Sequence, residues 1–387
     1  MLKETYLYLI FNITAVILGF LTLPIFTHYL TPKDFGVIAV FYVFGNFVSA
    51  VLSLGLMNAT YRFFYEKDNN IEEFKTLNFT NFFFITLFFI IGYFGLSIYF
   101  EKISLHIFDG KIDEKVLKLS FIAGCVLRLY MYFLNFFIYH GKSKLYSGTE
   151  IAYKVLAATF SILLLAYFIN DYYAIIYSSI ITSIIMLLVV IFLNRKLLKI
   201  SISLKALKKS IIFSYPAAIN EIQGGIHNSF DKIYLNKISG LYDLGLLEIA
   251  NKFGNLTKIF INSISNSWVP YFMKKSKNEL SNKEKVSDRY IEIVVFINLV
   301  SVFFSIFSEE AIKILTNEKF YFVKYYIPFI LYNVYLGNIF NLIFKLEIFK
   351  NKKMHLQIPV SFITFFSIIL LNIILIPIYG IWGLIIA

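Results

Sequence analysis

Stretches of apolar residues long enough to cross a lipid bilayer recur along nearly the whole chain. A membrane-spanning helix needs about 20 such residues, because each residue adds about 1.5 Å along the helix axis. We predict spans at residues 6–30, 35–61, 77–100, 116–139, 150–169, 172–193, 210–235, 243–271, 286–307, 323–349 and 355–377. Only 16% of the residues are charged, which is too few for the surface of a soluble protein of 387 residues. The sequence therefore predicts an all-α integral membrane protein.

Basic residues are concentrated in every second loop. The loops after even-numbered spans hold 20 Lys and Arg residues, whereas the loops after odd-numbered spans hold nine. Because basic loops stay in the cytoplasm, we expect the even-numbered loops and the N-terminus to be cytoplasmic. The net charge of +12 then needs no nucleic-acid partner to explain it.

The longest predicted cytoplasmic linker, residues 194–209, divides the chain into two lobes. The N-terminal lobe, residues 1–193, holds spans one to six, and the C-terminal lobe, residues 210–387, holds spans seven to eleven and the start of a twelfth. The twelfth apolar stretch begins at Tyr379 and the sequence stops at Ala387. About two helical turns cannot cross a bilayer, so we expect the twelfth helix to be truncated.

The two lobes are related by an internal repeat. Residues 34–47, which open span two, share five of fourteen positions with residues 243–256, which open span eight, at one ungapped offset. Both spans run in the same direction, so the repeat is parallel, with a pseudo-two-fold axis along the membrane normal. We predict two parallel-repeat six-helix lobes around a central cavity, which is a transporter architecture.

The eighth span carries polar side chains at intervals of three or four residues, along one face of a helix. These residues are Glu248, Asn251, Asn255, Lys258 and Asn262. Such a face cannot contact lipid, so it either lines water or packs on other polar helices. The first reading is favoured because Lys258 has no acidic partner one turn away. Lys252 lies four residues after Glu248 and can form a salt bridge on the helix surface as readily as it can contact a substrate.

Charged residues in three other spans also need an explanation, because each costs roughly 2.5–3.5 kcal/mol in a bilayer on insertion scales. Arg128 lies in the middle of span four without an acidic neighbour in its own helix. Span seven carries Glu221 and Asp231, and span ten carries Asn341 and Lys345. Lys345, near a cytoplasmic end, can also reach the interface by snorkelling. The deep cations suit an anionic substrate such as a phosphate or pyrophosphate group.

Span seven contains a predicted polar face and a predicted bend. The polar face comprises Asn220, Gln223, His227 and Asp231. Pro216 and the glycine pair at 224–225 weaken this helix. The bend can serve alternating access or can be a static kink for packing, and the sequence does not choose between them.

Motifs for catalysis and cofactor binding are absent from the sequence. It contains no nucleotide-binding P-loop, no H-E-x-x-H and no Gly-rich dinucleotide fingerprint. The single cysteine excludes an intrachain disulfide, and the five histidines lack metal-site spacing. We therefore predict a transporter and not an enzyme, with no catalytic residues, no cofactor and no metal.

Several segments resemble one known family of membrane proteins. They are YLTPKDFG at Tyr29–Gly36, the stretch Asp231–Leu256, SWVPYF at Ser267–Phe272 and NIILIPIYGIWGLIIA at Asn372–Ala387. In order and spacing they resemble the polysaccharide flippases (O-antigen or capsule type) of the multidrug/oligosaccharidyl-lipid/polysaccharide exporter superfamily. Members carry twelve to fourteen spans, so this chain departs from the family by stopping early in the twelfth.

The resemblance implies a protein that moves undecaprenyl-pyrophosphate-linked oligosaccharide from the inner to the outer leaflet, by alternating access, for the synthesis of capsule or lipopolysaccharide. It implies a multi-pass protein of the bacterial cytoplasmic (inner) membrane, with the lipid-linked oligosaccharide, the bilayer and other polysaccharide-assembly membrane proteins as partners. The residues we predict to bind substrate in the central cavity are Arg128, Lys258, Lys252, Asn255, Asn262, Asn251, Lys345 and Asn341. Those predicted to couple transport to an ion are Glu221, Glu248 and Asp231.

Two other functions fit a membrane protein of this size. A cation-coupled multidrug exporter of the same superfamily favours acidic cavity residues, and only Glu221 and Glu248 qualify here. A membrane polysaccharide polymerase or ligase exposes a large outer loop, whereas the longest predicted outer loops, near 101–115 and 308–322, are short. Both functions are therefore less favoured than the flippase.

Overall fold

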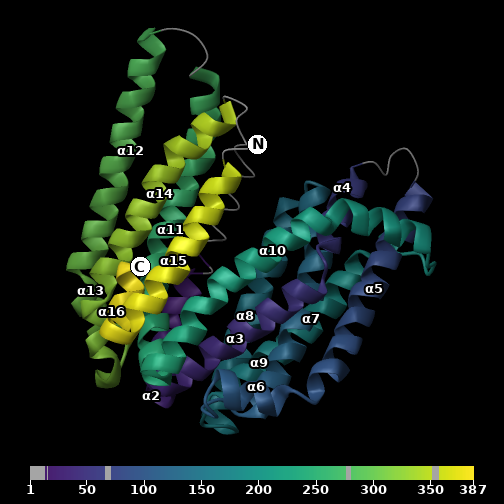
Figure 1. The fold of residues 1–387 in the computed structure, drawn as a ribbon, viewed down its shortest axis with the longest axis horizontal. Coiled ribbons are helices and arrows are strands. Elements are labelled where there is room, and N and C mark those ends of the chain that lie inside the picture. The colour runs from purple at the N-terminus through teal and green to yellow at the C-terminus, as the bar shows by residue number, and fades with distance from the viewer. Residues whose placement is uncertain (1–13, 15, 66–70, 276–279, 351–356) are drawn as a thin grey trace. The chain divides into compact units, whose positions relative to one another are not determined.

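The computed structural model describes residue 14 and residues 16–65, 71–275, 280–350 and 357–387. Within these ranges some side chains are outside the description, including those of Asn341 and Lys345. Every regular element in the described residues is a helix (Figure 1), which confirms the predicted all-α class.

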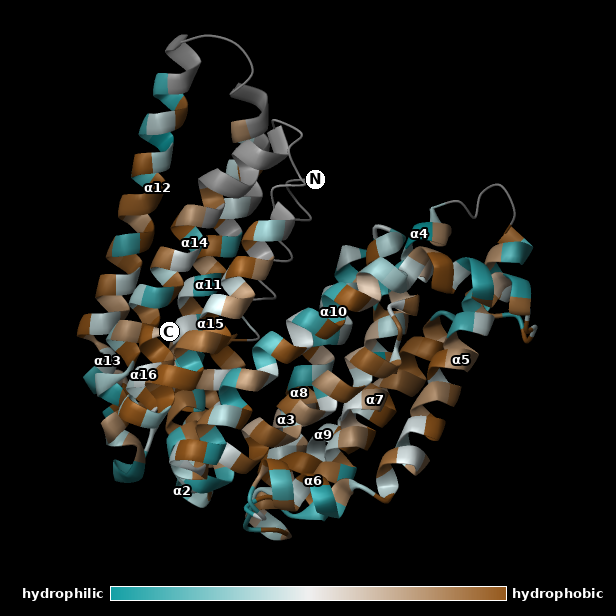
Figure 2. Cartoon of the chain, in the orientation of Figure 1, coloured by the Kyte–Doolittle hydropathy of each residue, from teal (hydrophilic) through white to brown (hydrophobic). Residues whose placement is uncertain are grey.

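The long helices follow the predicted spans. They are α3 (Pro32–Leu52), α5 (Ile71–Ser97), α7 (Glu114–Tyr139), α8 (Ser143–Tyr167), α9 (Tyr173–Leu193), α10 (Leu204–Ser239), α11 (Leu241–Lys275), α12 (Leu280–Ile306), α14 (Ile327–Lys350) and α15 (Gln357–Tyr379). In the described chain, seven helical stretches are long and apolar enough to cross a membrane. Figure 2 shows hydrophobic residues along most of α5 and hydrophilic ones near its start. Helices α10 and α11 are longer still, but carry the polar residues noted above.

Shorter helices lie between the long ones. They are α2 (Leu23–Tyr29), α4 (Leu56–Phe64), α6 (Phe100–Ile107), α13 (Ser308–Leu315), α16 (Ile381–Ile386) and two 3-10 helices, η2 (Arg195–Leu197) and η3 (Glu318–Tyr325). Helices α6 and α13 occupy the two predicted outer loops, so these loops are folded rather than irregular.

The chain packs as two compact units whose limits differ from those of the predicted lobes. One unit comprises Met1–Gly36 with Ile238–Ala387, and the other comprises Val37–Lys237. The predicted linker 194–209 belongs to the second unit because it is bonded to α5. The Asn78 amide donates to the Leu197 carbonyl at 2.9 Å, and the Ser203 N–H donates to the Thr80 hydroxyl at 3.1 Å.

The predicted second span, residues 35–61, is not one helix. Leu54 and Gly55 have φ values of 49° and 65°, in the left-handed region that ends helices, and they separate α3 from α4. Gly55 is closely approached by α10, because a Cβ there would lie 2.9 Å from the Ser214 carbonyl oxygen. The Ser214 hydroxyl donates to the Leu54 carbonyl at 3.1 Å. Helix α10 therefore holds the chain at the break.

The internal repeat is visible in the helix boundaries. Both ends of α12 follow those of α5 by the same offset of 209 residues (280 − 71 and 306 − 97), and each of these helices is followed by an eight-residue helix, α6 or α13. The offset equals that between Asp34 and Asp243 in the sequence repeat (243 − 34). The repeat predicted from sequence is therefore also a repeat of local structure.

Within the unit that contains both Gly36 and Gly245, the starts of the two repeats cross in a reciprocal contact. A Cβ at Gly36 would overlap the carbonyl oxygen of Leu241, and a Cβ at Gly245 would overlap that of Pro32. Pro32 and Leu241 are equivalent positions of the repeat, as are the two glycines. Equivalent residues of the two repeat starts therefore make equivalent contacts within this unit.

We expect Gly245→Ala to destabilise the protein by about 1–3 kcal/mol, because the added methyl group has no space against the Pro32 backbone. Thermal unfolding of the detergent-solubilised protein measures this. Gly95→Ala is the matched control, since a Cβ there meets no atom within 4 Å, and alanine suits a helix better than glycine. Equal melting temperatures for the two variants would show that the crossing is not tightly packed.

Candidate functional site

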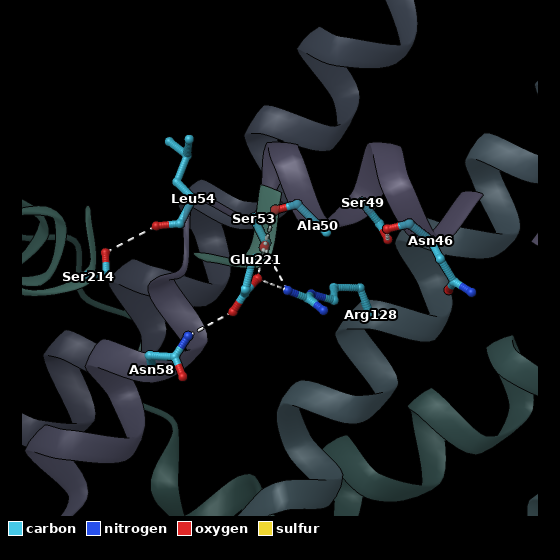
Figure 3. A network of polar contacts seen from close by, with 9 residues as sticks. All are labelled: Asn46, Ser49, Ala50, Ser53, Leu54, Asn58, Arg128, Ser214 and Glu221. Carbon is cyan, nitrogen blue, oxygen red and sulfur yellow. Dashed lines mark hydrogen bonds and ion pairs between the residues drawn. The ribbon is translucent and has the colours of Figure 1, made fainter. Parts of the chain in front are cut away.

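Arg128 on α7 and Glu221 on α10 form an ion pair (Figure 3). Nη2 of Arg128 donates to Oε2 of Glu221, and it also donates to the Ser53 hydroxyl at 3.1 Å. Each of the two charged side chains keeps 24% of its surface exposed. The partner that Arg128 lacks in its own helix thus comes from a residue 93 positions later in the chain.

Glu221 is held by both sides of the break in the second span. The Asn58 amide, on α4, donates to Oε1 of Glu221 at 2.7 Å, and the Ser53 hydroxyl lies 3.5 Å from Oε2. Ser53 directly precedes the left-handed residues Leu54 and Gly55, and Asn58 follows them by one turn. The break therefore places the side chains of Ser53 and Asn58 within hydrogen-bonding reach of the Glu221 carboxylate.

Two glycines bring Arg128 within reach of Ser53. A Cβ at Gly45 would overlap the Ser120 carbonyl oxygen, and a Cβ at Gly124 would overlap the Gly45 carbonyl oxygen, so α3 and α7 touch backbone to backbone. Arg128 lies one turn after Gly124, and Ser53 lies about two turns after Gly45. This close approach places the guanidinium against the end of α3.

Arg128 has hydrogen-bonding capacity that the ion pair does not use. Its Nε is buried and has no hydrogen-bond partner among the described residues. A guanidinium carries five N–H donors in a planar fork that matches the oxygen atoms of a phosphate or carboxylate. Arg128 therefore has donors to offer an anion besides the one that Glu221 accepts, although the two anions compete for its single positive charge.

The ion pair borders a cavity of about 650 Å³ within the unit Val37–Lys237. The lining residues are Tyr42, Val43, Asn46, Phe47, Ser49, Ala50, Gly124, Leu127, Arg128, Met131, Glu221, Gly224, Gly225, Asn228, Ser229 and Lys232. Among them are two cations, Arg128 and Lys232, and one carboxylate, Glu221. The other polar groups are neutral amides and hydroxyls. Such a lining suits an anion that also presents hydroxyl groups.

A second cavity of about 420 Å³ shares the ion pair with the first. Its lining residues are Met57, Asn58, Tyr61, Arg128, Asn135, Ile138, Tyr139 and Glu221. Because Arg128 and Glu221 line both cavities, the ion pair stands between them. The two side chains thus form part of a partition between the cavities, and separating them would remove that part.

The face of α10 that lines the larger cavity differs from the predicted one. Glu221, Gly225, Asn228 and Lys232 line the cavity at spacings of four, three and four residues. The predicted face of Asn220, Gln223, His227 and Asp231 is rotated from it by about 100°, one residue step. Asp231, predicted to couple an ion, is not a lining residue of either cavity. The sequence pattern shows two polar registers on this helix, and packing against α3 and α7 selects the other one.

The residues predicted on span eight lie on α11, in the other compact unit. Asn255, Lys258 and Asn262 are exposed, at the spacing of one helix face. Asn251, Glu248 and Lys252 are half-buried, and the Lys252 ammonium lies 5.7 Å from the centre of the Phe35 ring. Their role in a shared central cavity stays a prediction. The predicted side chains of Asn341 and Lys345 fall outside the described residues.

Sequence reasoning missed Lys232 and Asn228 as cavity residues, and it left Asn58 unremarked. Lys232 follows Glu221 by eleven residues, which is three helical turns, so the two share a face. That spacing could have identified Lys232. No local signal points to Asn58, because its role depends on the break that precedes it.

The sequence is similar to a family model and to a curated protein. Residues 1–276 match the family model described as "Polysaccharide biosynthesis protein". The capsular polysaccharide biosynthesis protein CapF of Staphylococcus aureus is 27% identical over 185 residues, which are 46% of this chain and 45% of CapF. The aligned part of the chain thus spans less than half the length of that curated relative.

Solved structures with a similar fold are membrane transporters. The inward-facing conformation of a multidrug resistance MATE family transporter of the MOP superfamily aligns with a TM-score of 0.60, over 99% of this chain and 90% of the transporter, at 13% identity. The outward-facing conformation of such a transporter aligns over the same shares, with a TM-score of 0.55 and 13% identity. At this identity the likeness establishes the fold alone.

Proposed function

The chain belongs to the polysaccharide biosynthesis protein family, and on this premise we propose that it is a flippase for lipid-linked oligosaccharide. The proposed substrate is an oligosaccharide on undecaprenyl pyrophosphate, moved by alternating access from the inner to the outer leaflet of the bacterial cytoplasmic membrane for surface polysaccharide synthesis. The family and the transporter fold agree with the prediction that the chain is a transporter and not an enzyme.

The observation that carries the substrate proposal is the Arg128 guanidinium at the wall of the polar cavity. It has an unused buried donor, and Lys232 adds a second cation to the same lining. Both groups suit a pyrophosphate, and the amides and hydroxyls of the lining suit sugar hydroxyls. A multidrug exporter of cations would need a negative cavity, whereas the carboxylate of this lining is already paired with Arg128.

The ion pair suggests how binding leads to movement. A pyrophosphate that binds Arg128 competes with Glu221 for the same guanidinium. When Glu221 is displaced, the partition between the two cavities is weakened, and the carboxylate becomes available to a proton or sodium ion. Release of the head group then restores the pair. Glu221 is thus the proposed coupling residue and Arg128 the proposed binding residue.

Transport by the purified protein tests this function. In proteoliposomes, undecaprenyl-pyrophosphate-linked oligosaccharide placed in one leaflet should become accessible in the other to a lectin or glycosidase that cannot cross the bilayer. Empty liposomes give the background rate. Movement of a cationic dye without movement of the lipid-linked sugar would contradict the flippase and support the multidrug alternative.

A further inference from the structure

A third cavity, a groove, lies in the unit Val37–Lys237 between α3, α6 and α10. It has a volume of about 340 Å³. Its lining residues are Phe47, His106, Ile107, Ile226, Ser229, Phe230, Ile233, Tyr234 and Lys237. Most of these side chains are apolar, and His106 and the cation Lys237 stand near the C-terminal ends of α6 and α10. Its lining thus contrasts with that of the polar cavity.

The same helix separates the groove from the polar cavity. Ile226, Phe230, Ile233 and Lys237 of α10 line the groove, at spacings of four, three and four residues. The α10 residues that line the polar cavity, from Glu221 to Lys232, have the same spacing but lie on a different face of the helix. Helix α10 therefore presents a polar face to the cavity and an apolar face to the groove.

The two spaces share part of one wall. Phe47 and Ser229 line both the polar cavity and the groove. At this wall α10 has Gly225, where a Cβ would lie 3.1 Å from the Phe47 ring. The wall is thus one aromatic ring and one small hydroxyl side chain, set against a glycine. A ligand with its polar part in the cavity needs to pass only this wall to place an apolar part in the groove.

We infer that the groove binds the polyprenyl chain of the substrate while the pyrophosphate occupies the cavity beside Arg128. Exposing hydrocarbon to water in the polar cavity would cost about 0.8 kcal/mol for each methylene group, and the groove offers the chain an apolar surface directly beside the cavity. This inference rests on the proposed function and adds to it the place where the chain leaves the polar cavity.

Photo-crosslinking of radiolabelled undecaprenyl pyrophosphate in phosphatidylcholine liposomes tests the groove. A benzophenone amino acid at Ile226, in the groove, should capture the labelled chain several-fold more than one at Ile219. Ile219 is the matched control because it lies on the same helix, is 57% exposed and does not line the groove. Excess unlabelled undecaprenyl phosphate should remove the signal, and phosphatidylglycerol should not. Equal capture at both positions, or competition by phosphatidylglycerol, would overturn the inference.

A binding measurement separates the groove from the cavity. Ile226→Asn should weaken binding of undecaprenyl pyrophosphate about tenfold and leave binding of inorganic pyrophosphate unchanged, because only the chain contacts this position. The same substitution at Ile219 should change neither. Unchanged affinity of Ile226→Asn for undecaprenyl pyrophosphate would contradict the groove. Failure of the wild-type protein to bind inorganic pyrophosphate, with capture at Ile226 retained, would contradict the proposed head-group site and leave the hydrocarbon groove supported.

Discussion

Replacing Arg128 with Gln should reduce transport of lipid-linked oligosaccharide by about 10- to 100-fold. A charge-assisted hydrogen bond is worth about 1.5–3 kcal/mol, and the glutamine amide cannot replace the charge or the planar fork. Arg128→Lys should retain part of the activity, because it keeps the charge and loses the fork. The flipping rate in proteoliposomes, at matched amounts of inserted protein, measures the effect.

Loss of folding has to be separated from loss of binding in this experiment. Arg128→Gln also leaves Glu221 half-buried without its cation, and this lowers stability. The double variant Arg128→Gln/Glu221→Gln removes both charges, so it should regain most of the melting temperature while transport stays reduced. Full transport by the double variant would exclude Arg128 as the binding residue.

A surface ion pair provides the matched control. Arg289 and Glu292 also form an Arg–Glu pair, but their side chains are 63% and 60% exposed. Exposed pairs of this kind contribute about 0–1 kcal/mol. Arg289→Gln should therefore leave both transport and melting temperature nearly unchanged. This result would show that removing an arginine does not by itself abolish transport.

Replacing Glu221 with Gln should tighten pyrophosphate binding while it slows transport. In the wild-type protein the anion has to displace the carboxylate from Arg128, and the neutral amide competes far less well. The Kd for inorganic pyrophosphate should fall by about tenfold, which corresponds to about 1.4 kcal/mol. The flipping rate should fall by a similar factor or more, because the variant has no carboxylate to expel the head group.

Isothermal titration calorimetry and the flipping assay, performed on the same preparation, measure the two effects. Glu221→Asp is the useful comparison, since it keeps the charge and shortens the reach to Arg128 and Asn58. Weaker pyrophosphate binding in Glu221→Gln would mean that Glu221 positions Arg128 rather than competing with its ligand. Unchanged transport would remove Glu221 from the coupling step.

Local properties of the chain were predictable from its residues. Hydropathy located the spans, because lipid exposure demands about 20 apolar residues wherever they fall. The repeat was predictable because residues 34–47 and 243–256 still share matching positions, and the helix boundaries keep the same offset. The cost of charge in a bilayer likewise singled out Arg128 and Glu221 as residues that need an explanation.

In contrast, the tertiary structure decided which charged residues pair and which face of a helix lines the cavity. Arg128 and Glu221 meet because α3 and α7 touch at Gly45 and Gly124, and because the chain breaks at Leu54–Gly55. Span seven has polar residues in two registers, so its spacing could not determine which face lines the cavity. Helix rotation is set by packing against neighbours distant in sequence. A one-residue change of facing turns a helix by about 100°, and this is why the sequence identified the charged residues but not their partners.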